Sequence, residues 1–224
     1  MSSLERLQEA ERMASELFEL AVNQGVLAPG NTELTASDGI RELAYVNFGV
    51  ESFWHKRIVR SGSNTVYPYR ENPEVLTIQH DDIVFLDFGP VFSNWEADFG
   101  RTYVHGFDPA KLRLRNEAER IWNLGRDFSI ENPEIRAHEL YAFVASEVHL
   151  AGYVLGEQRH VGHLIGEFPH ERVEDDKSTS YLTPENSLPL RRNDADGNRW
   201  HWILECHLVD PELNIGSFFE QLLI

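Results

Sequence analysis

The chain has 224 residues, of which 42% are hydrophobic, and this is enough for a packed core, so a disordered chain is excluded. Its formal net charge of −17 would repel the phosphates of nucleic acids and anionic membrane surfaces, so neither is expected as a partner. The single cysteine, Cys206, cannot form an internal disulfide, and residues 1–24 are too charged for a signal peptide or a membrane span, so we expect a cytoplasmic protein.

Helices are predicted in two pairs, over residues 3–23, 33–47, 109–128 and 133–150. The first follows a capping box made by Ser2 and Glu5. The third and fourth are each placed by a capping residue followed by proline, Asp108-Pro109 and Asn132-Pro133, because proline is favoured in the first turn of a helix.

Strands are predicted where β-branched, aromatic and aliphatic residues cluster between turn residues, over 57–60, 83–88, 96–105, 202–209 and 218–224. The order of elements is thus helices, strands, helices, strands. It favours an α+β fold of two similar halves, with helices on one side of an antiparallel sheet. Residues 183–198 are polar and are predicted to form a long loop.

Carboxylates interrupt three of these apolar strands, at Asp87, Glu205 and Glu220. A buried carboxylate without a partner is costly, so each must be neutralised, paired or bound to a metal ion. Basic residues are scarce around Glu205 and Glu220, which favours a bound cation. The alternative for any one of them is that the acid points to solvent from a half-exposed strand.

Two further residues complete a candidate ligand set. Asp98 lies eleven residues after Asp87, across a turn at Gly89-Pro90, so a hairpin can bring the two carboxylates together. His163 lies in a run from Gly162 to Glu171 whose glycines allow close backbone approach. A set of carboxylates with one imidazole suits Mn, Fe(II), Co or Zn better than copper.

The segments around these residues resemble metallopeptidase family M24. They are Leu86 to Pro90, Ala97 to Thr102, Gly162 to Glu171, Leu204-Glu205 and Phe219-Glu220. The resemblance implies the pita-bread fold, in which two related halves enclose a site for two divalent metal ions. It implies that Asp87 and Asp98 bind one ion, that Asp98, His163 and Glu205 bind the second, and that Glu220 bridges them.

The resemblance also implies an activity, that of an aminopeptidase or dipeptidase acting on short peptides. Ser61 to Asn64 and Glu167 to Glu171 are closer to the branch that cleaves Xaa-Pro bonds than to methionine aminopeptidase. Glu205 would handle the proton of the attacking water, and His170 would hydrogen-bond the substrate carbonyl or the developing tetrahedral intermediate. Arg101 and Thr102 either orient Asp98 and its neighbours or serve strand packing and surface charge, so they stay outside the core site. We expect one catalytic domain over residues 1–224, without a separate N-terminal domain, that could form a homodimer.

Two departures from the family pattern keep other functions open. Relatives of the prolidase type carry a histidine shortly after the Ser-Gly-x-Asn run, where this chain has Val66 to Tyr69; Tyr67 or Tyr69 could donate a hydrogen bond instead, and His55 or His80 could fold inward. Arg159 and His160 stand where many relatives have another histidine. The alternatives are a creatinase-like hydrolase of a small non-peptide C–N bond and a binding module of the same fold.

Overall fold

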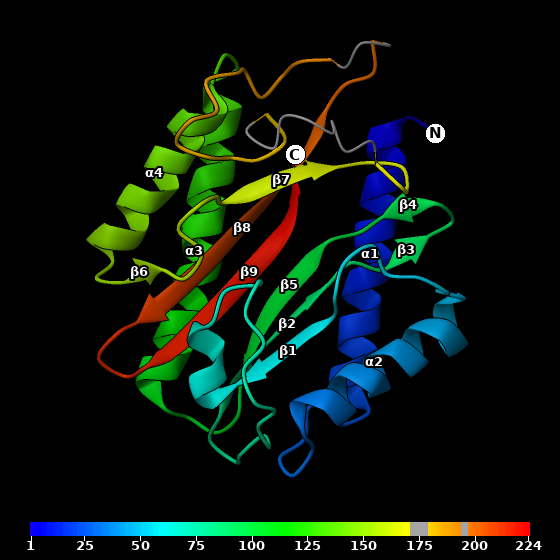
Figure 1. Cartoon of the computed structure of the whole chain (residues 1–224), viewed down its shortest axis with the longest axis vertical. Helices are drawn as coiled ribbons and strands as arrows, with labels where there is room; N and C mark the ends of the chain where they lie inside the picture. Colours follow the sequence, from blue (N-terminus) through cyan, green and yellow to red (C-terminus); the bar gives the residue numbers. More distant parts are fainter. Residues whose placement is uncertain (171–178, 194–196) are drawn as a thin grey trace.

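The computed structural model describes residues 1–170, 179–193 and 197–224, and over these ranges helices and an antiparallel sheet form the α+β arrangement expected (Figure 1). The helices are α1 (Ser3–Asn23), α2 (Glu33–Phe48), α3 (Pro109–Glu131) and α4 (Ala137–Leu150). In Figure 1 the first pair lies beside the strands of the N-terminal half and the second pair beside those of the C-terminal half. The predicted pairs of helices are confirmed.

Local capping explains where most of these helices begin and end. Ser2 accepts a hydrogen bond from the Glu5 backbone and the Glu5 carboxylate accepts one from Ser2, so the capping box of α1 is confirmed. Asp108 caps α3 through the amides that follow Pro109, also as predicted. Helix α2 ends at Gly49, which is left-handed with φ of 67°.

The predicted start of α4 at Asn132-Pro133 is wrong. Helix α3 continues to Glu131, and the Asn132 amide and side chain both donate to the Phe128 carbonyl, so this residue ends one helix and does not begin the next. A short turn follows, and α4 starts after Arg136, whose amide donates to the Glu139 carboxylate. A proline after a possible capping residue did not distinguish a turn from a helix start.

The main sheet joins both halves of the chain. Its strands are β1 (Ile58–Ser61), β2 (Ile83–Phe88), β5 (Phe99–Val104), β6 (Val154–Leu155), β7 (Gly162–Ile165), β8 (His201–Asp210) and β9 (Ile215–Leu223). The order is β1-β2-β5-β9-β8-β6, with β7 also paired to β8, and the pairing of β5 with β9 connects the two halves. A small hairpin, β3 (Val91–Phe92) with β4 (Trp95–Glu96), precedes β5, and a 3-10 turn, η1 (Gly62–Val66), follows β1.

The alternation of side chains along the strands separates a helix-covered face from a second face. On β2, Val84 and Leu86 belong to the core beneath α1 and α2, whereas Phe85 and Asp87 point the other way. On β8, Leu204 belongs to the core beneath α3 and α4, as do its neighbours at even positions of the strand. The carboxylates within these strands therefore face away from the helices.

The remaining expectations concern the loop and the membrane. The predicted loop at 183–198 lies partly outside the described residues, and its described part contains turns and bends without a strand. None of the helices in the described ranges is both long and apolar enough to span a membrane.

Candidate metal centre

The register of the sheet aligns the predicted carboxylates in one row. Asp87 on β2 is paired with Gly100 on β5, Gly100 is paired with Glu220 on β9, and Glu220 is paired with Glu205 on β8. Residues paired across antiparallel strands project to the same face. The three acids, on β2, β9 and β8, thus lie on one face of the sheet, with Gly100 of β5 between Asp87 and Glu220.

Asp98 and His163 approach this row from its edge. Asp98 lies in the break between β4 and β5, so the predicted strand 96–105 is interrupted at the residue that the site uses. His163 lies on β7, which pairs with β8. The His163 Nε2 atom is 3.0 Å from Asp98 Oδ2 and 3.9 Å from Glu220 Oε1, so the structure brings the predicted ligands together.

The carboxylates are buried with too little positive charge around them. Asp87, Asp98 and Glu220 are 6%, 3% and 2% exposed. Burial, with the neighbouring carboxylates, raises the pKa of Asp87 to about 7 and the pKa of Glu220 well above its ordinary value. Among the described residues, Glu220 Oε2 is buried without a hydrogen-bond partner, and Glu205 Oε1 has only the ion pair with His160. Unpaired carboxylate oxygens in a group of this kind fit divalent cations.

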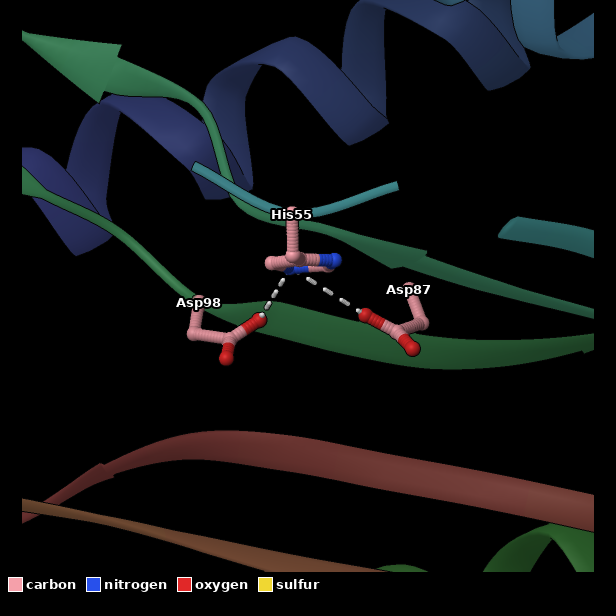
Figure 2. Close-up of side chains that lie close together, drawn as sticks. All are labelled: His55, Asp87 and Asp98. Atoms are coloured by element: carbon pink, nitrogen blue, oxygen red, sulfur yellow. Dashed lines mark hydrogen bonds and ion pairs between the residues drawn. The ribbon is translucent and has the colours of Figure 1, made fainter. Parts of the chain in front are cut away.

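Asp98 is held differently, because an imidazole faces each of its oxygens. His55 Nε2 is 3.1 Å from Oδ1, on the side opposite His163, and 3.6 Å from Asp87 Oδ1 (Figure 2). Burial would raise the pKa of Asp98, but the two histidines outweigh it and hold that pKa below its ordinary value. Burial would lower the pKa of each imidazole, but the carboxylates raise both to about 9.

Two overlapping groups of donor atoms could each hold a metal ion. One is made by His55, Asp87 and Asp98, and the other by Asp98, His163 and Glu220, so Asp98 is shared. Glu205 belongs to neither group; it is paired with Glu220 across β8 and β9, and His160 Nδ1 is 2.7 Å from Glu205 Oε1. Burial would raise the pKa of Glu205, and His160 more than offsets it.

His170 lies at the edge of the candidate metal centre and is hydrogen-bonded to a buried carboxylate. Its amide lies 3.2 Å and its Nδ1 2.6 Å from the carboxylate of Glu96, which is 1% exposed. The imidazole also lies edge-on to Trp54 with ring centroids 5.5 Å apart. Glu171, the last residue of the predicted motif, lies outside the described residues.

The candidate ligands line one cavity of about 960 Å³, together with His55, His160 and His170. Its walls mix the acids and histidines with apolar side chains, namely Trp54, Ile58, Phe85, Leu164, Pro169 and Phe218. Tyr69 also lines it, and the Tyr69 hydroxyl accepts a hydrogen bond from the Lys56 amide. The volume is that of a site for a small ligand.

The structure distinguishes the alternatives that the sequence left open for Arg101, Thr102, His55 and His80. Arg101 donates to the carbonyls of Gly100 and Glu220 and to the Gln221 side chain, and Thr102 is hydrogen-bonded to the Phe218 backbone. Both therefore tie β5 to β9 and do not hold Asp98. Of the two histidines that could fold inward, His55 does so, whereas His80 is exposed.

Sequence reasoning missed the supporting residues Glu96 and His160. Glu96 occupies a two-residue strand, and its partner His170 is 74 positions later, so no local pattern announces the pair. His160 was considered only because it and Arg159 stand where many relatives have another histidine. The single available signal was the closeness of His160 to His163 in sequence.

Comparison with known proteins agrees with this site. The model of metallopeptidase family M24 matches residues 5–194. An Xaa-Pro dipeptidase of Lactobacillus helveticus is 27% identical over 170 residues, which are 75% of this chain and 45% of that protein. One of Lactobacillus delbrueckii subsp. lactis is 26% identical over 170 residues, 76% of this chain and 45% of that protein.

Solved structures show the same fold. A prolidase from Thermococcus sibiricus has a TM-score of 0.75 at 20% identity, over 97% of this chain and 55% of that one. An Xaa-Pro dipeptidase from Bacillus anthracis has a TM-score of 0.76 at 22% identity, over 97% of this chain and 56% of that one. The pita-bread fold is thereby confirmed.

The chain spans about half the length of these relatives. The expectation of a single domain without a separate N-terminal one stays a prediction. The family match extends over most of the sequence and includes the segments of Asp87, Asp98 and His163. The chain therefore belongs to metallopeptidase family M24, as a relative of its Xaa-Pro dipeptidases.

Proposed function

We propose that the protein is a hydrolase with two metal ions that removes the first residue from short peptides, including those with proline second. The observation that carries the proposal is the convergence of Asp87, Asp98, His163, Glu205 and Glu220 on one cavity, with two overlapping groups of metal donors. The Xaa-Pro dipeptidases and prolidases among its relatives support the choice of substrate.

In this proposal the ligands are divided as the family resemblance implies. Asp87 and Asp98 would hold one ion, Asp98, His163 and Glu205 would hold the other, and Glu220 would contribute to both. The donor set, mostly carboxylate with imidazole, fits Mn, Co, Fe(II) or Zn. When bound, such a pair of ions polarises the scissile carbonyl and lowers the pKa of the attacking water.

The protein's own residues supply proton transfer and positioning. Glu205 takes the proton of the attacking water, and His160 beside it keeps the carboxylate ionised and able to accept. His170 hydrogen-bonds the substrate carbonyl as negative charge develops there. The Glu96 carboxylate holds the His170 ring through Nδ1, which leaves Nε2 for the substrate.

The cavity supports a short substrate. Its volume of about 960 Å³ lies in the range of small-molecule sites and suits a di- or tripeptide. Apolar walls from Ile58, Phe85 and Phe218 can pack against a proline ring or an apolar first residue.

The test is a substrate screen on metal-reconstituted protein. Protein loaded with cobalt or manganese is incubated with dipeptides and tripeptides, Xaa-Pro pairs included, and with small amides and guanidino compounds, and products are identified by mass spectrometry. We expect release of the first residue from peptides, and no release by Glu220→Ala. A loaded protein that leaves every peptide intact would overturn the proposal.

The other outcomes identify the alternatives. Cleavage of a small amide or guanidino compound alone would favour the creatinase-like hydrolase, which Tyr69 in place of the usual histidine keeps open. A protein that retains no metal would favour the binding module.

A further inference from the structure

His55 repeats, on the other side of Asp98, the geometry of His163. We propose that His55 is a ligand of the first metal ion, so that each ion of the centre has one imidazole; this rests on the two-metal function proposed above. The ligand division carried over from the family gives the first ion carboxylates alone. The imidazole added here changes what that site should bind.

The two histidines match atom by atom. His55 Nδ1 lies 2.7 Å from the Lys56 carbonyl oxygen, and His163 Nδ1 lies 2.9 Å from that of Leu164, in each case the next residue along the chain. A carbonyl only accepts, so Nδ1 carries the proton in both rings. Each Nε2 then faces Asp98, at 3.1 Å from Oδ1 for His55 and 3.0 Å from Oδ2 for His163. A hydrogen bond from one ring nitrogen to a carbonyl, with the other nitrogen turned toward oxygen donors, is the usual setting of a metal-binding histidine.

The surroundings of His55 Nε2 call for a cation. This atom has carboxylate oxygens of both Asp98 and Asp87 near it, at 3.1 and 3.6 Å, and the three side chains form one of the two groups of donor atoms (Figure 2). The competing explanation is a permanent ion pair between a charged imidazole and the two acids. Even with positive charge on His55, His160 and His163, one of the four carboxylates would lack a counter-charge, whereas two divalent ions balance all four.

Hydrogen bonds of the neighbouring Trp54 fix the position of the His55 ring beside the two acids. The Trp54 amide donates to the Gly89 carbonyl at 2.9 Å, and the Trp54 indole donates to the Ala97 carbonyl at 2.9 Å. These contacts attach the His55 segment to the connection that carries both Asp87 and Asp98. Gly89 provides the space for both rings, because a Cβ at this position would overlap with the His55 and Trp54 rings. The His55 side chain is only 8% exposed, so its aim is fixed by packing.

An imidazole at the first site predicts a particular metal preference. Carboxylates alone suit Mn and Mg, whereas an added imidazole nitrogen favours Co, Zn and Fe(II). Loss of the His55 ring should therefore weaken cobalt binding more than manganese binding. A residue that only supported the fold would weaken both equally.

The test is proton NMR of the full chain with two equivalents of cobalt(II) bound. Each ligated imidazole whose Nδ1–H points to a carbonyl gives one strongly shifted, solvent-exchangeable resonance. We expect two such resonances in the wild type, one of which disappears in His55→Ala and the other in His163→Ala. The matched control is His80→Ala, an exposed histidine, which should keep both. Titration should show that His55→Ala loses about 100-fold in affinity for one cobalt ion and clearly less for manganese.

The outcomes separate this inference from the proposed function. A wild type that binds two cobalt ions and cleaves peptides, but shows a single exchangeable resonance, overturns the role of His55 and leaves the function standing. A protein that binds no cobalt overturns both. The number of exchangeable resonances in the wild-type spectrum tests the role of His55 even if His55→Ala does not fold.

Discussion

Asp98 shows how much of this site depends on single side chains. One carboxylate receives two histidines that lie 108 positions apart in the chain, His55 and His163. Each oxygen of Asp98 therefore has its own partner, and the carboxylate can be shared between two ions. Glu96 has a similar role for His170, which it holds by both the amide and the ring.

At this scale we predict that His170→Ala keeps both metal ions but lowers the rate of peptide cleavage by about 100-fold. The reason is that Glu96 holds the Nδ1 atom of His170 outside both groups of metal donors, while loss of one positioned hydrogen-bond donor costs about that factor. Elemental analysis and steady-state kinetics on the same preparation provide the measurement. Loss of metal in step with activity would show that His170 is a ligand or a support for one.

Among the strands, β5 and β9 join the two halves of the sheet, and Gly100 lies at the contact between them. Gly100 is paired with Asp87 on one side and with Glu220 on the other. A Cβ here would lie 2.5 Å from the Phe218 ring and 2.9 Å from Glu220 Cβ. The residue between the two acids must therefore be small.

We predict that Gly100→Ala lowers the free energy of unfolding by about 1 to 3 kcal/mol, the scale of overpacking, and weakens metal binding as well. Chemical denaturation and metal titration measure the two effects. The control is Gly166→Ala, whose Cβ would meet His170 Cβ, at 3.4 Å, and no other side chain of the described residues within 4 Å. Equal behaviour of the two variants would contradict the steric argument.

Helix α1 is tied to β9 through Glu11, whose carboxylate accepts from the Leu222 amide at 2.5 Å. Burial raises the pKa of Glu11 to about 7, although the Leu222 amide and the charge of Arg101 on β5 oppose it. Because this pKa is higher in the folded than in the unfolded chain, the contribution of Glu11 to stability falls as pH rises from about 4.5 to about 7.

We predict that Glu11→Gln lacks this pH dependence. Relative to the wild type, the variant should gain about 1 to 3 kcal/mol of unfolding free energy between pH 5 and pH 8, since a pKa difference of one unit is worth about 1.4 kcal/mol. Urea denaturation of both proteins at several pH values measures this difference. Because the two proteins share all other titratable groups, the contributions of those groups cancel. A difference that is constant with pH would show that Glu11 ionises normally.

In the whole molecule, the site is part of what holds the halves together. Asp87 and Asp98 belong to the N-terminal half, and His163, Glu205 and Glu220 to the C-terminal half. Each half has its own main hydrophobic cluster, and a small cluster that includes Leu7 and Leu222 joins the halves. Metal binding should therefore also stabilise the contact between them.

We predict that removing metal with a chelator lowers the melting temperature, and that added manganese or cobalt restores it. A ligand at 100 times its Kd stabilises the folded state by about 2.7 kcal/mol. Calorimetry of wild type and Glu220→Ala, each with and without metal, measures the effect, and the variant should respond much less. An unchanged wild-type melting curve would mean that the ions do not bind across the halves.

The sequence by itself determined what depends on neighbours along the chain. Caps at Ser2 and Asp108 fixed two helix starts, apolar runs placed the strands, and acids within those runs indicated candidate metal ligands, because these signals act over a few residues. The short β7 went unpredicted because it has only four residues and begins with Gly162, which gives too little of a strand pattern.

Only the tertiary structure decided which side chains meet. Whether His55 faced inward, whether Arg101 reached Asp98 or β9, and which face carried Glu220 all depend on the pairing of β5 with β9, two strands separated by more than 100 residues. Such pairings are selected by packing of the whole core and by strand register, where a slip of one residue turns every side chain to the other face. That information is spread over the entire chain, so no local pattern contains it.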